Sequence, residues 1–223
     1  MSCDRPIRLA FVSASGGVGK TKLSLSLAWL LRKKGKRVLL MDLDPTAAAS
    51  LLLLGDENYE YFDRSGRTLS HLIQRRRRGQ NVDFDDYRVS TEIMDQRIDL
   101  LPPGEELIRI VNDLWTGGAP GPKFSNMMAG AISPGRYDFI IVDSAPFFDP
   151  RYTALSVYFA DILVIPLRPS VVDFARTLRM LVEIGEDLQI RLQQVTGQSG
   201  ELSPQDLLIC MFKMASPQTS VPE

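Results

Sequence analysis

A short glycine-rich segment, Gly16-Gly17-Val18-Gly19-Lys20-Thr21, constrains the fold of this chain more than any other feature. The apolar run Ile7–Ser13 before it predicts a buried strand, and leucines at helical spacing over Lys22–Lys34 predict a helix after it. Gly35 stops the helix, and a second apolar run follows at Arg37–Asp42. This order predicts a βαβ unit with a right-handed crossover, in which the loop joins a strand to a helix N-terminus.

Apolar and amphipathic segments alternate along the rest of the chain. Apolar runs predict buried strands at Ile98–Leu101, Phe139–Asp143, Ile162–Pro166 and Leu207–Phe212. Helices are predicted at Leu69–Arg78, Glu105–Trp115, Phe124–Ile132, Tyr152–Phe159 and Val171–Val195, and a linker at Thr116–Pro122. Because buried strands that alternate with helices are typical of an α/β fold, we expect a mostly parallel twisted sheet flanked by helices on both faces. Residues 1–214 are expected to form this domain, followed by a disordered tail at 215–223.

Composition narrows the classes of function. The chain has 223 residues and a formal net charge of −1, so an acidic partner must be met by a local patch. Its two cysteines, Cys3 and Cys210, are far apart in the sequence and predict neither a disulfide framework nor a cysteine-rich metal site. No apolar run approaches the roughly 18 residues that span a bilayer. These features predict a cytoplasmic protein.

The glycine-rich loop has the residue types that bind phosphate. Its glycines let the backbone turn N–H groups inward without Cβ clashes, at the N-terminus of a helix. Lys20 is predicted to reach the outer phosphates of a nucleotide, and the Thr21 hydroxyl to bind Mg²⁺. The general pattern has a further glycine where this chain has Ala14, and a purely structural turn is the alternative. The predicted nucleotide-binding residues are Ser15, Gly16, Gly17, Val18, Gly19, Lys20, Thr21 and Lys22.

Three aspartates follow predicted strands. Asp42 and Asp44 end the second strand, and Asp143 ends the apolar run Ile140–Val142. Because ligands lie at the carboxyl ends of parallel strands, all three are expected to face the phosphate loop. One of Asp42 and Asp44 can hold Mg²⁺ through water while the other positions or deprotonates an attacking water; for this pair a turn and a helix cap are the alternative. An acid after an apolar strand is the Walker B arrangement, which places Asp143 near the metal.

In combination, these motifs resemble the ParA/MinD family of deviant Walker A P-loop ATPases. Asp42-Leu43-Asp44-Pro45-Thr46 matches the second motif of that family and Tyr137–Pro146 its third, and the resemblance extends from about residue 7 to residue 212. It implies ATP and Mg²⁺ as cofactors, with Lys20 and Asp44 as catalytic residues and Thr21, Asp42 and Asp143 at the metal. It further implies an ATP-dependent sandwich dimer that segregates plasmids or chromosomes, or positions a large cargo. Such a protein binds DNA nonspecifically at the nucleoid and is stimulated by an adaptor protein.

Two departures from the family pattern affect the expected mechanism. The family's signature lysine, which reaches across the dimer to the partner's phosphates, corresponds to Ser15. Because serine supplies no cation, slow hydrolysis is predicted unless another base substitutes, and Arg151 is one candidate. With serine at this position, the loop is similar to that of the ParA-like ATPases that distribute carboxysomes. The family also continues for several elements after the last predicted strand, where this chain has a short tail, so the adenine-contacting residues stay open.

The sequence leaves alternatives for partner and reaction. The Arg75–Arg78 run at a helix end suits either nonspecific contact with DNA phosphates or a solvated helix terminus. Ser216–Glu223 cannot form an amphipathic helix, so membrane binding is not expected. The enzyme alternative is an amidoligase of vitamin synthesis, which phosphorylates a bound carboxylate rather than water. The binding alternative is a regulatory module that holds ATP but scarcely hydrolyses it, in keeping with Ser15.

Overall fold

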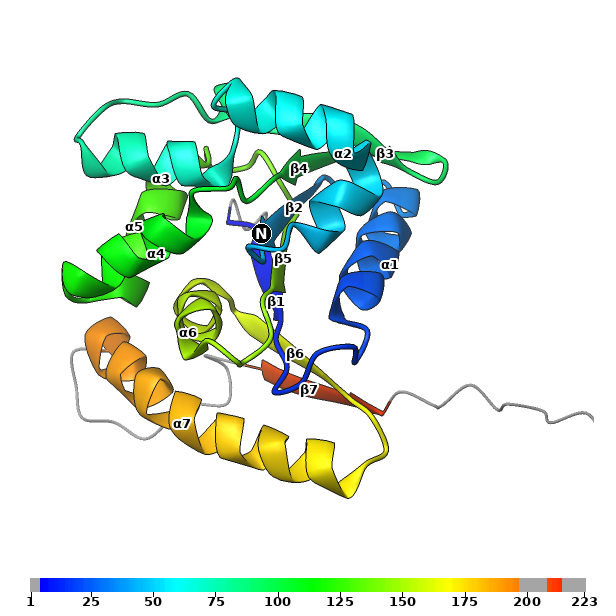
Figure 1. The fold of residues 1–223 in the computed structure, drawn as a ribbon, viewed down its shortest axis with the longest axis vertical. Coiled ribbons are helices and arrows are strands. Elements are labelled where there is room, and N and C mark those ends of the chain that lie inside the picture. Colours follow the sequence, from blue (N-terminus) through cyan, green and yellow to red (C-terminus); the bar gives the residue numbers. More distant parts are fainter. Residues whose placement is uncertain (1–4, 197–207, 214–223) are drawn as a thin grey trace, which may run out of the picture.

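The chain folds around one seven-stranded sheet with helices on both faces (Figure 1). The computed structural model describes residues 5–196 and 208–213. The strand order is β3-β4-β2-β5-β1-β6-β7. Strand β3 runs antiparallel to β4, and all other neighbouring strands are parallel. This arrangement confirms the predicted fold class, a mostly parallel sheet flanked by helices.

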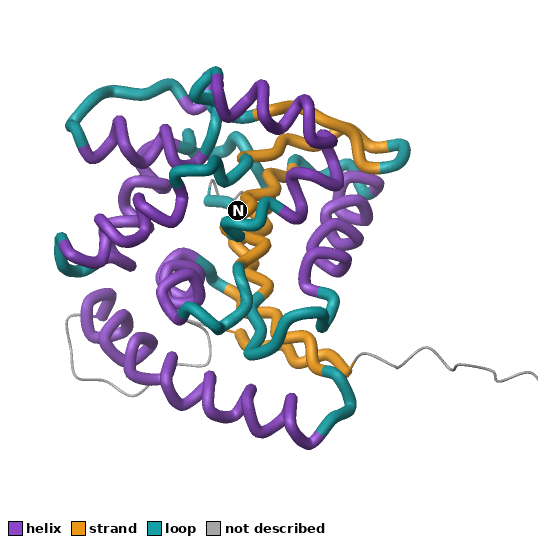
Figure 2. The backbone as a smooth tube through the Cα atoms, in the orientation of Figure 1, coloured by secondary structure: helices purple, strands orange, loops and turns teal. Residues whose placement is uncertain are grey.

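The elements alternate between strand and helix along most of the chain (Figure 2). The strands are β1 Ile7–Phe11, β2 Val38–Leu43, β3 Val89–Ile93, β4 Gln96–Leu101, β5 Phe139–Ser144, β6 Ile162–Leu167 and β7 Leu208–Lys213. The helices are α1 Lys20–Lys33, α2 Ala48–Arg64, α3 Leu69–Arg77, α4 Leu107–Thr116, α5 Pro120–Ala131, α6 Pro150–Phe159 and α7 Val171–Thr196. A short 3₁₀ turn, Phe84–Asp86, precedes β3.

Alternate residues of the central strands pack against different helices. In β2, Leu39 and Met41 join the cluster of buried side chains beneath α3 to α7, whereas Val38 and Leu40 join the cluster beneath α1 and α2. Figure 1 shows the same division, with α1 on one side of the sheet and α3, α4, α5 and α6 on the other. Because side chains of a strand alternate between its faces, a strand covered on both faces must be apolar throughout. All six residues of β2 are buried, and only Asp42 among them is charged.

Three regions differ from the sequence predictions. Helix α2 has no predicted counterpart, because only Ala49 and Ser50 in it are buried and Gly55, at φ 73°, interrupts it. Strand β3 is a mostly polar edge strand, which lacks the apolar signal of the inner strands. The predicted linker Thr116–Pro122 is wrong in its second half, where Pro120 opens α5. Proline is tolerated there because a first-turn N–H has no partner within the helix. The predicted tail 215–223 lies outside the described residues.

Candidate nucleotide-binding site

The glycine-rich loop connects the carboxyl end of β1 to the first residue of α1. Gly17 and Gly19 have φ angles of 71° and 90°, in the left-handed region where a Cβ is strained. Gly19 is also the N-cap of α1, and no side chain of a described residue caps this end. The first turn of α1 contains no acidic residue. The backbone N–H groups and the positive end of the helix dipole are therefore available to an anion.

Lys20 is held in a desolvated position at this helix start. Its residue is 7% exposed, and Nζ donates a hydrogen bond of 2.9 Å to Oγ of Ser13. The Ser13 hydroxyl in turn donates to the backbone carbonyl of Ser15 at 2.7 Å. Burial lowers the pKa of Lys20, while the charges of Asp143 and Asp44 oppose that shift. The ammonium thus lies near both aspartates.

Asp143 is a buried carboxylate close to Lys20 and Thr21. It is 1% exposed, and neither oxygen accepts a hydrogen bond from the described residues. Burial raises its pKa to about 6, while the Thr21 hydroxyl and the Lys20 ammonium act to lower it. An orphan carboxylate of this kind is costly unless a cation or water completes it. The Thr21 hydroxyl and the Asp143 carboxylate are a donor set that fits Mg²⁺, which uses few protein ligands and completes its shell with phosphates and water.

Asp42 lies beside Asp143 in the neighbouring strand, in direct register. Its Oδ2 accepts hydrogen bonds from the backbone N–H and the hydroxyl of Ser50, at 2.9 and 2.8 Å, and its Oδ1 accepts from the Asp44 N–H at 3.1 Å. Burial, reinforced by the charge of Asp143, raises the pKa of Asp42 to about 8. Asp42 therefore ties β2 to the first turn of α2, and its place at the metal stays a prediction.

Asp44 sits one residue beyond β2 and is 8% exposed. Its Oδ1 accepts from the backbone N–H and the hydroxyl of Thr46, at 2.8 and 2.7 Å. No described residue donates to its Oδ2. A local turn thus fixes the carboxylate through one oxygen and leaves the other able to accept a hydrogen bond from water.

Ser15 contacts a helix that is distant in the sequence. It is 3% exposed, and its hydroxyl donates to Oδ1 of Asp173, in the first turn of α7, at 2.8 Å. Arg168 pairs with the same carboxylate, with Nε 2.6 Å from Oδ2 and Nη2 3.2 Å from Oδ1. The pKa of Asp173 is held low by Arg168 and by the Ser15 hydroxyl. A guanidinium therefore stands close to the position of the family's signature lysine.

Other residues singled out in the sequence lie away from this cluster. The Arg151 guanidinium pairs with Asp149 and donates to Asn112 on α4. Arg75–Arg78 closes α3, where Arg77 pairs with Asp113 at 3.1 Å. Neither contact brings these cations to the phosphate loop of the same chain. A role for Arg151 across a dimer stays a prediction.

Sequence reasoning missed Ser13, Ser50 and Asp173. Ser13 ends the predicted first strand, so its place beside the loop was a usable signal. Ser50 and Asp173 carry no such local signal, because each meets the site only through the packing of α2 or α7 onto the sheet.

The loop, the buried lysine and the three aspartates define a P-loop nucleotide-binding protein on an α/β sheet. More specifically, the chain belongs to the AAA_31 family, an AAA domain whose model matches residues 8–194, and it is a ParA/MinD-like P-loop ATPase. It is 29% identical over 189 residues to the chromosome-partitioning ATPase Soj of Thermus thermophilus, which covers 83% of this chain and 66% of Soj. It is 30% identical over 179 residues to the maintenance of carboxysome distribution protein A of Synechococcus elongatus, which covers 78% of this chain and 64% of that protein.

A solved structure has the same fold. Cobyrinic acid a,c-diamide synthase from Mycobacterium smegmatis, with a bound ATP analogue and magnesium, superposes with a TM-score of 0.69 at 23% identity, over 94% of this chain and 75% of the other. The chain spans between 23% and 66% of the length of the curated relatives that it matches. Within residues 5–196 and 208–213, no helix is both long and apolar enough to cross a membrane.

Proposed function

We propose that the chain is a ParA-like ATPase that binds ATP with Mg²⁺ at this site and alternates between a monomer and an ATP-bound sandwich dimer. The observation that carries the proposal is the orphan carboxylate of Asp143, 1% exposed and unpartnered among the described residues. Asp143 belongs to β5 and lies close to Lys20, which is buried at the start of α1. Buried groups of both signs around an uncapped helix N-terminus favour a ligand that carries phosphate and a divalent cation.

In this proposal each residue has a physical role toward ATP. The glycine-rich backbone and the helix N-terminus hold the β- and γ-phosphates, and Lys20 neutralises their charge at a position shielded from water. Thr21 and Asp143 would hold Mg²⁺, which would offset charge on the transferring phosphate. Asp44 presents its free Oδ2 to the attacking water, while Thr46 fixes the other oxygen. Asp42 braces β2 against α2 through the hydrogen bonds that it accepts from Ser50, and from its place beside Asp143 it would support the metal.

The contact of Ser15 with Asp173 favours slow basal hydrolysis. The hydroxyl is turned toward α7 and brings no charge to the phosphates. A cation at the γ-phosphate contributes a large electrostatic stabilisation in a closed site, so its loss slows turnover. An adaptor protein that raises the rate, by completing or reordering the site, fits such a switch. Arg168 and Arg151 are the two cations to test for a role across the dimer.

An exposed apolar surface beside the loop supports a dimer. Phe148 is 79% exposed and lies next to Gly16, where an added Cβ would be 3.8 Å from its ring. On α7, Val171, Phe174 and Leu178 are exposed on one face, although their helix neighbour Asp173 reaches Ser15. Exposed apolar side chains that adjoin a functional site mark a surface that is covered by a partner. A second copy of the chain, facing the same nucleotides, is the partner that we propose.

Segregation or positioning of DNA or a large cargo is the wider role we propose. The names of two relatives, a chromosome-partitioning ATPase and a carboxysome distribution protein, support a function of this class. The Arg75–Arg78 run supplies cations for nonspecific contact with DNA phosphates, and through them the protein would associate with the nucleoid.

The experiment is sedimentation of the full chain with ADP, with ATP and Mg²⁺, and with ATP, Mg²⁺ and a random DNA duplex. We expect a monomer with ADP, a dimer with ATP, and comigration with DNA only in the ATP sample. An unchanged monomer that hydrolyses ATP only when a small carboxylic acid is present would favour the amidoligase alternative, whose fold this chain shares. ATP binding without hydrolysis in any sample would favour the regulatory module.

A further inference from the structure

A recess opens at the edge of the sheet opposite the phosphate loop. It has a volume of about 270 Å³ and lies where β2, β4 and β5 begin, whereas the loop follows the carboxyl end of β1. Four of its eight lining residues are arginines: Arg32, Arg37, Arg97 and Arg136. The sequence pattern around α1 adds to the charge, because Arg32-Lys33-Lys34-Gly35-Lys36-Arg37 has five cations in six residues. The recess is therefore a second concentration of positive charge, separate from the ATP site.

Two of the four guanidiniums are already neutralised. Arg37 pairs with Asp138, with Nη2 2.7 Å from Oδ1, and Arg136 pairs with Asp85, with Nη1 3.0 Å from Oδ2. Arg32 and Arg97 form no ion pair with any described residue. Arg32 donates through Nη1 to the Lys36 carbonyl at 2.8 Å, while its Nε is buried without an acceptor. A buried N–H of a cation without an acceptor is unfavourable, and an anion in the recess would supply one.

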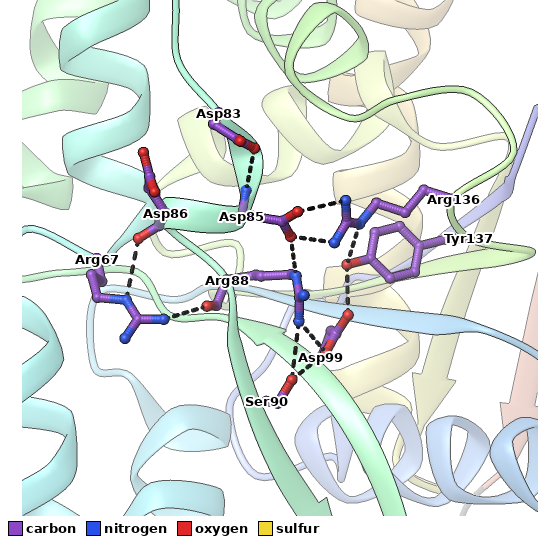
Figure 3. Close-up of polar contacts among 9 residues, drawn as sticks. All are labelled: Arg67, Asp83, Asp85, Asp86, Arg88, Ser90, Asp99, Arg136 and Tyr137. Atoms are coloured by element: carbon purple, nitrogen blue, oxygen red, sulfur yellow. Dashed lines mark hydrogen bonds and ion pairs between the residues drawn. The ribbon is translucent and has the colours of Figure 1, made fainter.

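Asp99, the carboxylate that lines the recess, is occupied by other donors (Figure 3). Its Oδ1 accepts from Arg88 Nη1 at 3.0 Å and from the Ser90 hydroxyl at 2.8 Å, and its Oδ2 accepts from the Tyr137 hydroxyl at 2.8 Å. Figure 3 also shows that Asp85 lies between Arg88 and Arg136. Asp85 and Asp99 are thus committed to other donors. Glu92 lies opposite Arg97 in the register of β3 and β4, but no carboxylate of a described residue forms an ion pair with Arg32 or Arg97.

We propose that this recess binds a small phosphorylated anion, with a phosphate or pyrophosphate group held by Arg32 and Arg97. A guanidinium presents planar N–H pairs that match phosphate oxygens, and several cations around one cavity favour a multiply charged anion over a monocarboxylate. The volume admits a few phosphate groups but not a nucleic acid duplex. The site is independent of ATP binding at the phosphate loop.

The test is calorimetric titration of the full chain with inorganic pyrophosphate, in a buffer that contains a chelator to remove Mg²⁺. The double variant Arg32→Gln/Arg97→Gln is compared with Arg64→Gln/Arg179→Gln, which removes the same charge from exposed arginines that pair within their own helices. We expect the affinity to fall at least tenfold in the recess variant and less than twofold in the control. Equal losses in both variants, or none in either, would overturn the proposal.

Three further measurements complete the test. Lys20→Ala should retain the pyrophosphate site; if only this variant loses binding, the anion sits at the phosphate loop and the proposal is wrong. If the double variant does not fold, Arg97→Gln alone, at an exposed strand position, should weaken binding at least threefold. If a DNA duplex binds through the same arginines and pyrophosphate does not bind, the proposal is also wrong, and the surface is a nucleic acid site.

Discussion

Replacement of Lys20 by alanine should weaken ATP binding strongly without unfolding the chain. The lysine is 7% exposed, its Nζ is bonded to Ser13 at 2.9 Å, and burial lowers its pKa, so its charge is poorly solvated before a nucleotide arrives. A hydrogen bond to a charged group contributes about 1.5–3 kcal/mol. Its loss corresponds to a roughly 10- to 150-fold rise in Kd for ATP.

The assay is calorimetric titration with a non-hydrolysable ATP analogue and Mg²⁺, with circular dichroism as the check on folding. Lys34→Ala is the matched control, because Lys34 follows the other end of the same helix and is exposed. We expect a change below twofold in the control. An affinity within twofold of the parent for a folded Lys20→Ala would refute the assignment of the phosphate site.

Three further predictions test the electrostatics of the chain. Replacing Arg75–Arg78 with alanine should flatten the slope of log affinity for DNA against log salt by roughly 0.9 for each DNA phosphate that these arginines neutralise, and an unchanged slope would leave the run as a solvated helix end. The folded pKa of Asp42, about 8, lies above its ordinary value of 3.8, so the folded state binds the extra proton and the free energy of unfolding should fall as pH rises toward 8. In urea titrations at pH 6, 7 and 8, Asp42→Asn should reduce the change of the free energy of unfolding with pH by at most about 1.4 kcal/mol per pH unit. The same pH dependence in the parent and the variant would contradict the raised pKa. Ser15→Lys should raise single-turnover hydrolysis at least tenfold, on the scale of 10³–10⁵ that a cation supplies in related phosphoryl transfer, while Ser15→Ala should not; equal rates would mean that this position does not face the phosphates.

The sequence predicted the parts of the fold that depend on local pattern. The apolar runs placed β1, β2, β5 and β6 because inner strands of a parallel sheet are apolar on both faces. The glycine-rich motif placed the phosphate loop because a left-handed backbone at Gly17 and Gly19 requires glycine there. Helix α2 was not predicted because its many exposed residues and Gly55 weaken the helical periodicity of apolar residues. Strand β3 was not predicted because an edge strand has no continuous apolar run.

Contacts between distant segments could not be read in advance. The hydrogen bond from Ser15 to Asp173 joins residues 158 positions apart, and it depends on how α7 packs against the sheet. The sequence marked Arg151 as a candidate substitute cation; within one chain its guanidinium pairs with Asp149, and its role across a dimer stays a prediction. The arginine recess likewise gathers residues from α1 and from the starts of β2, β4 and β5, which no motif connects. Local sequence pattern thus predicts the backbone of the site, whereas the charged groups that contact it depend on tertiary packing.

Single-turnover hydrolysis by Asp44→Ala, measured with the variant saturated in ATP and Mg²⁺, tests the proposed ATPase mechanism most directly. Asp44 keeps one oxygen on Thr46 and presents the other to water, so its removal should spare nucleotide binding and abolish the positioning of the attacking water. We predict ATP affinity within threefold of the parent, a rate at least 100-fold lower, and a population trapped as the ATP-bound dimer. Hydrolysis at the parental rate by the saturated variant would contradict the account.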